Sequence, residues 1–163
     1  MKKKLLLVLL FVLPLIVVLS CIPNPAPEVE ITTFTQYKFS VLPGDSLGFI
    51  DTLGFEVKNG VDAILQGMYI DYYKSYWDGH EQKFTTTHYY ALGTFLPASS
   101  DSDTIKVYLL NFPVPMKDAV NALYADPNIR SMRGTMHFII TDAYGSGKRI
   151  DLTHDIGIWR LDK

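Results

Sequence analysis

The stretch QGMYIDYYKSYW, from Gln66 to Trp77, and the Asp78-Gly79 pair that follows it decide the fold. Five of these twelve residues are aromatic, and aromatic side chains favour the pleated, half-buried surface of a strand. Asp-Gly between two strand-forming runs is a strong signal for a tight hairpin turn. We therefore predict a long strand from Ile64 to Trp77 and a return strand from Lys83 to Phe95 beside it.

Before and after this hairpin, apolar and polar residues alternate along the sequence with the period of two that is typical of strands. Turn signals such as Pro43-Gly44-Asp45 separate the alternating runs. Further strands are therefore predicted at residues 28–42, 47–59, 104–112, 131–141 and 149–161. In the run 47–59, Phe49, Leu53, Phe55 and Val57 share the predicted inner face, and strict alternation places Asp51 among them.

The period changes once, after Pro115. Apolar side chains then follow the spacing of one helix face, at Met116, Val120, Leu123 and Tyr124. Asp126-Pro127 ends this pattern, so a short amphipathic helix is predicted. The whole pattern predicts an all-β protein, an antiparallel immunoglobulin-like β-sandwich of about seven strands with one short helix near the C-terminal third.

The first twenty residues have the parts of a secretory signal peptide. Lys2, Lys3 and Lys4 precede an apolar run from Leu5 to Leu19, which is shorter than the roughly 20 residues that a spanning helix needs. The run ends in Val18-Leu19-Ser20-Cys21, which resembles a bacterial lipobox. In this interpretation Cys21 receives lipid on its sulfur and becomes the new N-terminus. The alternative is an uncleaved N-terminal anchor with an incidental cysteine.

A lipidated Cys21 makes the bilayer the first predicted partner of the chain. Stable anchoring needs about two acyl chains, such as palmitate, and a bacterial lipoprotein cysteine carries more than one. We predict a signal peptide at 1–20, the lipidated cysteine and a proline-rich stalk at 21–28, and the β-sandwich domain at 29–163. The chain is then held in the cell envelope on the extracytoplasmic side. Ile22 is not the aspartate that often retains lipoproteins at an inner membrane, which favours an outer membrane where two exist.

Charge and cysteine content exclude two classes of protein. The full chain has 15 Lys and Arg against 17 Asp and Glu, and loss of three lysines with the signal peptide leaves 12 against 17, a net charge of about −5. No basic stripe is present in the sequence, so nucleic acid is not an expected partner. Cys21 is the single cysteine, so the fold cannot rest on internal disulfides.

The order of these pieces resembles the water-stress and hypersensitive-response (WHy) domain of the late-embryogenesis-abundant type 2 proteins, over residues 28–162. The resemblance is carried by Phe55–Asn59, Ala63–Tyr72, Thr104–Val107 leading to Lys117–Tyr124, and Arg133–Phe138 followed by Arg149–Leu152. It implies a binding, interaction or desiccation-protection domain without enzymatic chemistry, and so no catalytic residues. A generic immunoglobulin-like sandwich produces the same periodicities.

The side chains that carry chemistry show no convergent pattern in the sequence. His80, His88, His137 and His154 include no pair at a metal-ligand spacing, so no metal, cofactor or catalytic residue is predicted. His154 shares the face of apolar neighbours, as a core histidine or at a bulge. Asp101 and Asp103 form a solvated loop, with weak calcium binding as the alternative. Gly145-Ser146-Gly147 fits a hairpin turn better than a nucleophile elbow.

An aromatic surface is the most suggestive candidate for binding. Tyr69, Tyr73 and Trp77 share one parity of their predicted strand with the polar residues Asp71 and Ser75. Exposed aromatic groups beside polar groups are used by sugar-binding and protein-binding faces. The alternative is that tyrosine is simply a good strand former whose hydroxyl reaches water.

These observations lead to one functional hypothesis and its alternatives. The chain is predicted to be a membrane-anchored, non-enzymatic envelope lipoprotein that acts as a binding or scaffold module, or as a stress-protective one. The alternative is a lipoprotein that binds carbohydrate or cell wall through the Tyr69, Tyr73 and Trp77 face. A protein or a glycan is therefore the expected partner besides the bilayer.

Mass spectrometry of the mature N-terminal peptide tests the predicted anchor. We expect the peptide to begin at Cys21 and to carry the added mass of its acyl chains, because the signal peptide is removed at the lipobox. A bare thiol, with residues 1–20 still attached, would contradict the prediction.

Overall fold

The computed structural model describes residues 25–100 and 103–161. The predicted signal peptide and Cys21 lie outside the described residues. In the described part of the chain, no helix has both the length and the apolar character needed to span a bilayer.

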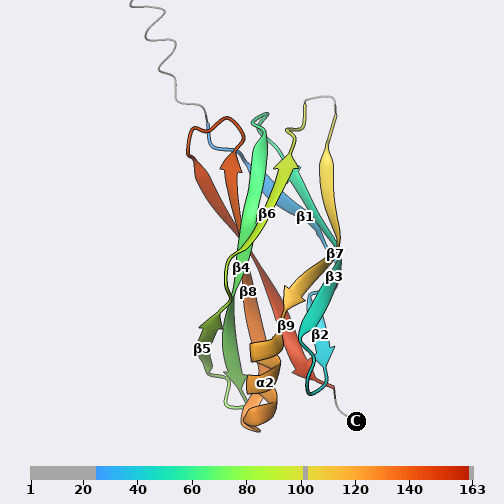
Figure 1. Cartoon of the computed structure of the whole chain (residues 1–163), viewed down its shortest axis with the longest axis vertical. Helices are drawn as coiled ribbons and strands as arrows, with labels where there is room; N and C mark the ends of the chain where they lie inside the picture. The colour runs from blue at the N-terminus through green and yellow to red at the C-terminus, as the bar shows by residue number, and fades with distance from the viewer. Residues whose placement is uncertain (1–24, 101–102, 162–163) are drawn as a thin grey trace, which may run out of the picture.

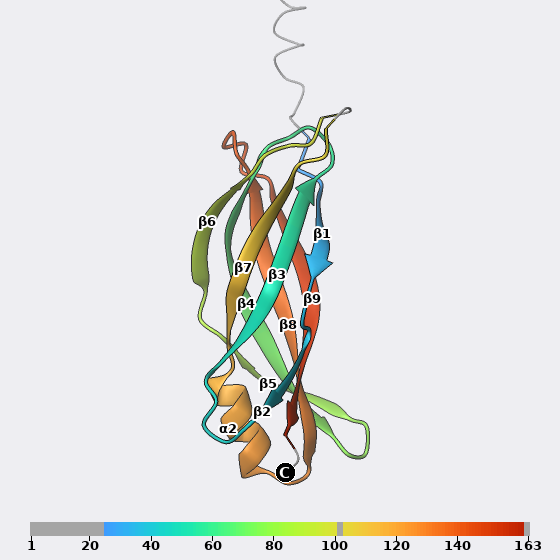
Figure 2. The ribbon, with the colours of Figure 1, turned by 90° about the vertical axis from the view of Figure 1, so that its right-hand side faces the viewer.

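Two sheets pack face to face and form a β-sandwich (Figures 1 and 2). The narrower sheet, sheet A, has the antiparallel order β1-β3-β7. Its strands are β1 (Val29–Phe34), β3 (Leu47–Val57) and β7 (Lys106–Pro115). The architecture confirms the predicted all-β sandwich.

The wider sheet, sheet B, has the order β2-β9-β8-β4-β5, with β6 also paired to β4. Its strands are β2 (Lys38–Val41), β4 (Ala63–Tyr76), β5 (Glu81–Thr86), β6 (Tyr90–Leu96), β8 (Ile129–Asp142) and β9 (Arg149–Arg160). All of these pairings are antiparallel except that of β2 with β9, which is parallel. β5 and β6 share one side of β4, each along a different part of it.

The described residues form nine strands rather than about seven, because two predicted strands are each divided. The run 28–42 breaks at Gln36, whose φ of 66° lies in the left-handed region. Before the break β1 pairs with β3, and after it β2 crosses to sheet B and pairs with β9. The run 83–95 divides between β5 and β6 at residues 87–89. Alternation continues through such a break in the sequence, so periodicity alone does not reveal it.

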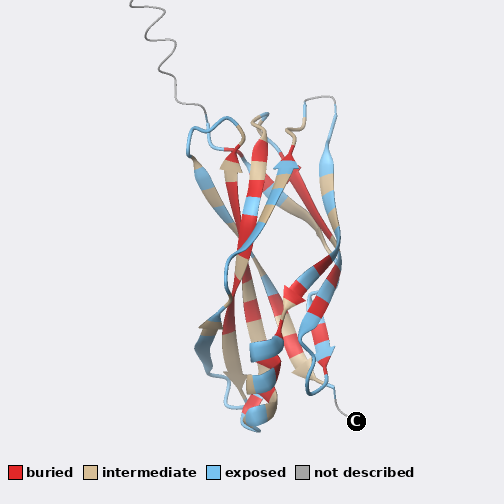
Figure 3. Ribbon diagram, in the orientation of Figure 1, coloured by how far each residue is buried: buried red, intermediate tan, exposed pale blue. Residues whose placement is uncertain are grey.

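The core lies between the two sheets. Along most strands, buried residues that face the core alternate with more exposed residues that face outward (Figure 3). In β3 this alternation changes phase. Leu53, Phe55 and Val57 are buried as predicted, but Phe49 is 48% exposed and Ile50 takes its place in the core. Asp51, predicted to point inward, is exposed. The change occurs beside Asn111 of β7, whose φ of 51° interrupts the regular pleat of the neighbouring strand.

The predicted helix is confirmed as α2 (Lys117–Ala125), which lies at the end of the sandwich far from the start of β1 (Figure 1). Its buried residues are Ala119, Val120 and Leu123. The guanidinium of Arg160 in β9 donates to the carbonyl oxygens of Leu123 and Asp126. A cation at a helix C-terminus pairs with carbonyls that have no partner within the helix, so this contact fastens α2 to the sheet.

Candidate functional site

The predicted aromatic face lies on the outer surface of sheet B. Tyr69 and Tyr73 of β4 are half-buried there, while Met68, Ile70 and Tyr72 point the other way into the core. Trp77 lies just beyond β4 in the hairpin turn and is 69% exposed. Since a strand rises about 3.3 Å per residue, Tyr69 and Tyr73 lie about 13 Å apart.

Each of the three aromatic rings already has a neighbour from β8 or from the turn before it. Tyr69 stacks on His137, with 4.4 Å between the ring centroids, and the Arg133 guanidinium lies 4.4 Å from the Tyr73 ring centroid. The indole N–H of Trp77 donates to the Pro127 carbonyl at 3.3 Å. The structure therefore brings the three residues onto one side of sheet B as separate positions, not as one continuous platform.

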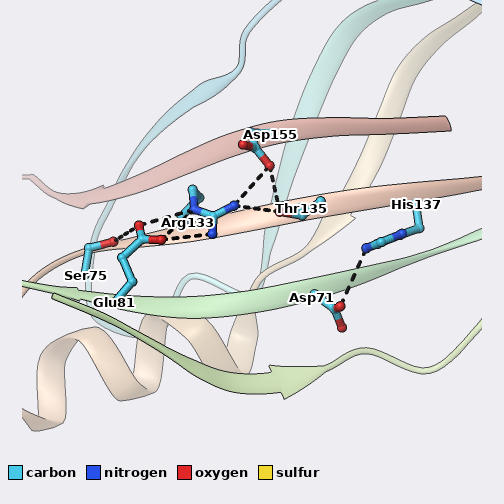
Figure 4. Close-up of polar contacts among 7 residues, drawn as sticks. All are labelled: Asp71, Ser75, Glu81, Arg133, Thr135, His137 and Asp155. Atoms are coloured by element: carbon cyan, nitrogen blue, oxygen red, sulfur yellow. Dashed lines mark hydrogen bonds and ion pairs between the residues drawn. The ribbon is translucent and has the colours of Figure 1, made fainter.

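Arg133 is the centre of a polar cluster beside Tyr73 (Figure 4). It donates to the Glu81 carboxylate, with Nη2 2.9 Å from Oε2, and to the hydroxyl of Thr135. It also forms an ion pair with Asp155 at 3.3 Å, and the Ser75 hydroxyl donates to Glu81. The Arg133 hydrogen bonds hold the pKa of Glu81 below its ordinary value. The cluster joins β4, β5, β8 and β9, so its evident role is to tie these strands together.

A second polar cluster surrounds the buried carboxylate of Asp71 on β4. Lys83 Nζ lies 2.8 Å from Asp71 Oδ2, and the Thr86 hydroxyl donates to the other carboxylate oxygen. Burial alone would raise the pKa of Asp71, but the hydrogen bonds from Lys83 and Thr86 hold it below its ordinary value. His137 lies between Asp71 and Asp151, at 3.6 and 3.4 Å (Figure 4 shows the first contact).

The other three histidines take structural positions. His80 stacks on Tyr76 and contacts Asp78 in the hairpin turn, and His88 is exposed between β5 and β6. His154 keeps its inner parity, where its ring stacks on Phe34 at 3.9 Å and burial lowers its pKa. Across residues 25–100 and 103–161, no three His, Cys, Asp or Glu side chains gather as metal ligands. Asp101, of the possible calcium loop, lies outside the described residues.

The predicted turn at Gly145-Ser146-Gly147 is confirmed. Both glycines have positive φ, 76° and 75°, which a tight turn requires and glycine adopts without strain. The Ser146 hydroxyl donates to the Asp142 carboxylate at 2.7 Å, and the Ser146 N–H donates to its other oxygen. Ser146 therefore closes the β8–β9 turn and has none of the geometry of a nucleophile elbow.

The sequence did not predict an apolar cleft of about 810 Å³ between β6 and β7. Its lining residues come from both sheets: Leu47, Met68, Tyr90, Ala91, Leu92, Thr94, Tyr108, Leu109, Leu110, Phe112, Pro113 and Pro115. None of these described residues carries a charge. The cleft marks the side on which the sandwich stays open, since β7 is the last strand of sheet A and β6 covers only part of β4.

One signal in the sequence could have indicated the cleft. A strand with one wet face should alternate, yet Tyr108, Leu109 and Leu110 are apolar in succession. Leu109 is half-buried, but Leu110 is 68% exposed and Tyr108 is also exposed. Exposed apolar residues that lie together on an edge strand form the kind of surface that is typical of interaction sites.

The last residues of the predicted stalk are fixed to the body of the domain. The side chain of Asn59 accepts a hydrogen bond from the Glu28 N–H at 3.0 Å and donates to the Ala26 carbonyl at 2.6 Å. The chain therefore enters the sandwich beside the β3–β4 and β8–β9 turns, at the end opposite α2 (Figure 1).

Comparison with known families and with curated proteins gives no match.

Replacing Asp71 by asparagine tests the buried carboxylate cluster. We expect the free energy of unfolding at neutral pH to fall by about 1–2 kcal/mol, because Lys83 loses its charged partner. The folded pKa of Asp71 lies below its unfolded value of about 3.9, so its stabilising effect is present above that pH and is lost as the pH falls through the folded pKa. The difference in the free energy of unfolding between the unchanged protein and the variant should therefore become smaller at acidic pH.

Urea unfolding at neutral pH and at a series of acidic pH values measures this deficit. The matched control is Asp51→Asn, which changes an exposed carboxylate on β3 and should leave the stability nearly unchanged. A deficit for Asp71→Asn that keeps the same size at every pH would contradict the prediction.

Proposed function

We propose that this chain is a non-enzymatic binding module of the bacterial cell envelope, anchored to a membrane through acylated Cys21. We further propose that the apolar cleft between β6 and β7 is its binding site. The observation that carries the proposal is the cleft itself, whose volume of about 810 Å³ falls in the usual range for ligand sites.

The energetics of the cleft favour an occupant. Apolar surface in contact with water costs about 25 cal/mol per Å², so covering the lining of the cleft stabilises a complex. The described lining residues offer hydroxyl groups from Tyr90, Thr94 and Tyr108 as their polar side-chain groups. A ligand that fits is therefore apolar over most of its surface and uncharged where it meets the cleft.

The polar clusters support the non-enzymatic part of the proposal. Arg133 pairs with both Glu81 and Asp155, and Lys83 pairs with Asp71. These side chains cross-link neighbouring strands on the outer face of sheet B and do not line the cleft. The shifted pKa values of Glu81, Arg133, Asp71 and Lys83 are accounted for by hydrogen bonds and ion pairs within the sheet. Such pairs perturb pKa values without any catalytic role.

The entry point of the chain supports an anchored arrangement. Because Asn59 holds residues 26 and 28 against one end of the sandwich, an acylated Cys21 only a few residues earlier would keep that end near the bilayer. The end that carries α2 and Trp77 would then point away from the membrane. Ile22 favours the outer membrane in a cell with two membranes, and the protective role implied by the WHy resemblance stays a prediction.

A thermal-shift measurement on the full chain in phospholipid nanodiscs tests the cleft as a binding site. We use two uncharged probes, 1-decanol and the acetylated, amidated peptide Thr-Val-Thr-Val-Thr-Val-Thr, whose valines form one apolar face. A probe that binds the folded state at about 100 times its Kd stabilises it by about 2.7 kcal/mol and so raises Tm. At least one probe should do so.

Two lysine variants locate the effect. Leu110→Lys places a charge at the cleft and should abolish the rise in Tm. Leu42→Lys changes another exposed leucine, directly after β2 and outside the cleft, and should preserve the rise. The proposal fails if neither probe raises Tm, or if both variants respond alike.

Carbohydrate binding is a second candidate, favoured by the exposure of Trp77 beside Arg130, whose guanidinium lies 5.9 Å from the indole ring centroid. Titration with soluble glycans and cell-wall fragments should change the tryptophan emission of the full chain. The change should vanish in Trp77→Ala, which retains Trp159 as an internal reference. An emission spectrum that no glycan alters would remove this candidate.

A further inference from the structure

The strand β7 borders the cleft with its edge as well as with one face. Tyr108, Leu109 and Leu110 are consecutive, and all three line the cleft. Because successive side chains of a strand point to opposite faces, a strand can present three in a row to one space only along its edge. Within residues 25–100 and 103–161, β7 pairs with β3 on its other side and with no strand on this one.

A free edge in an apolar cleft restricts what can occupy the cleft. The edge presents backbone N–H and C=O groups, and water is their partner when the cleft is empty of ligand. A hydrocarbon chain would displace that water and leave each buried group unpaired, at a cost of about 1–3 kcal/mol. An extended peptide would displace the same water and replace it with the hydrogen bonds of an added strand.

The regular part of this edge is short and well defined. Lys106–Leu110 pairs residue by residue with Thr52–Glu56 of β3. Beyond it, Asn111 has a positive φ, and Pro113 and Pro115 have no N–H to donate. Lys106 and the prolines are residues that protect sheet edges, so they leave an unprotected edge of about five residues between them.

The opposite border of the cleft, formed by β6, is less suited to pairing with an added strand. Gly93 interrupts β6 with a φ of 65°, and the pairing of β6 with β4 shifts register between Leu65 and Gly67. An incoming strand is therefore expected to pair with β7 and to contact β6 through its side chains. Sheet A would gain a fourth strand, which would cover the part of sheet B that β7 leaves open.

We propose that the cleft binds an extended segment of a partner protein, which adds as a strand to the Lys106–Leu110 edge of β7. The segment carries apolar side chains at alternate positions, which point into the cleft, and no charge on that face, because the described lining residues are uncharged. This inference rests on the proposed function and names the class of partner that the same site takes.

Hydrogen exchange followed by mass spectrometry on the full chain in nanodiscs tests the added strand. The probe is the same acetylated, amidated Thr-Val-Thr-Val-Thr-Val-Thr peptide, which has strand-forming residues and an apolar face. At a concentration about ten times its Kd, it should slow about tenfold the exchange of those amides in Lys106–Leu110 that face the free edge rather than β3. The free edges of β1, β2 and β5 should keep their exchange rates.

Three controls separate strand addition from other modes of binding. The same peptide with every amide N-methylated keeps its side chains but has no backbone N–H donors, and its methyl groups obstruct the close backbone approach of a strand, so it should give little protection of β7. Leu110→Lys should reduce the protection, and Leu42→Lys should not. Sedimentation velocity of the nanodisc sample reports whether protection of β7 instead accompanies self-association.

Each alternative result overturns the inference in a recognisable way. Protection by 1-decanol but not by the peptide would assign the cleft to hydrocarbon and leave the proposed function standing. Protection of β7 that grows with protein concentration and needs no peptide would assign it to a second copy of the chain. Equal protection by the N-methylated peptide would exclude strand pairing, and no effect from any probe would overturn the inference together with the proposed function.

Discussion

The pairing of β4 with β8 along their whole length is the interaction on which the rest of the structure depends. Both strands have 14 residues, and they form the centre of sheet B. β9 continues the sheet on one side, while β5 and β6 share the other side of β4. Sheet A has three strands and cannot cover a sheet of this width, so the sandwich stays open beside β7.

This difference in width separates two kinds of surface. The outer face of sheet B carries aromatic and charged side chains, and a chain of ion pairs runs across it from Glu81 through Arg133 to Asp155. Such pairs hold the strands in register, and because these charged groups already have partners within the protein, they have little need of a ligand. A ligand can still add contacts at the cleft, because its apolar lining is not fully buried and the free edge of β7 has backbone groups without a neighbouring strand.

The position of the cleft suits a tethered protein. Asn59 holds the entering chain at one end of the sandwich, whereas the cleft runs along its side. A partner can therefore reach β7 without displacing the proposed stalk. The proposed anchor and the proposed binding site use different elements of the fold, so loss of one need not abolish the other.

The sequence by itself determined the all-β class, the hairpin at Asp78-Gly79, the turn at Gly145-Ser146-Gly147 and the helix after Pro115, because local spacing and turn chemistry specify such features. Tertiary structure alone decided that residues 28–42 serve both sheets, that β3 changes phase near Asp51, and that one side remains open. Alternation reports whether a side chain is buried. Which strand lies beside it depends on contacts between distant residues. Local spacing could therefore show an apolar run at Tyr108–Leu110, but not that β7 is an edge strand or that β6 forms the other border of a cleft.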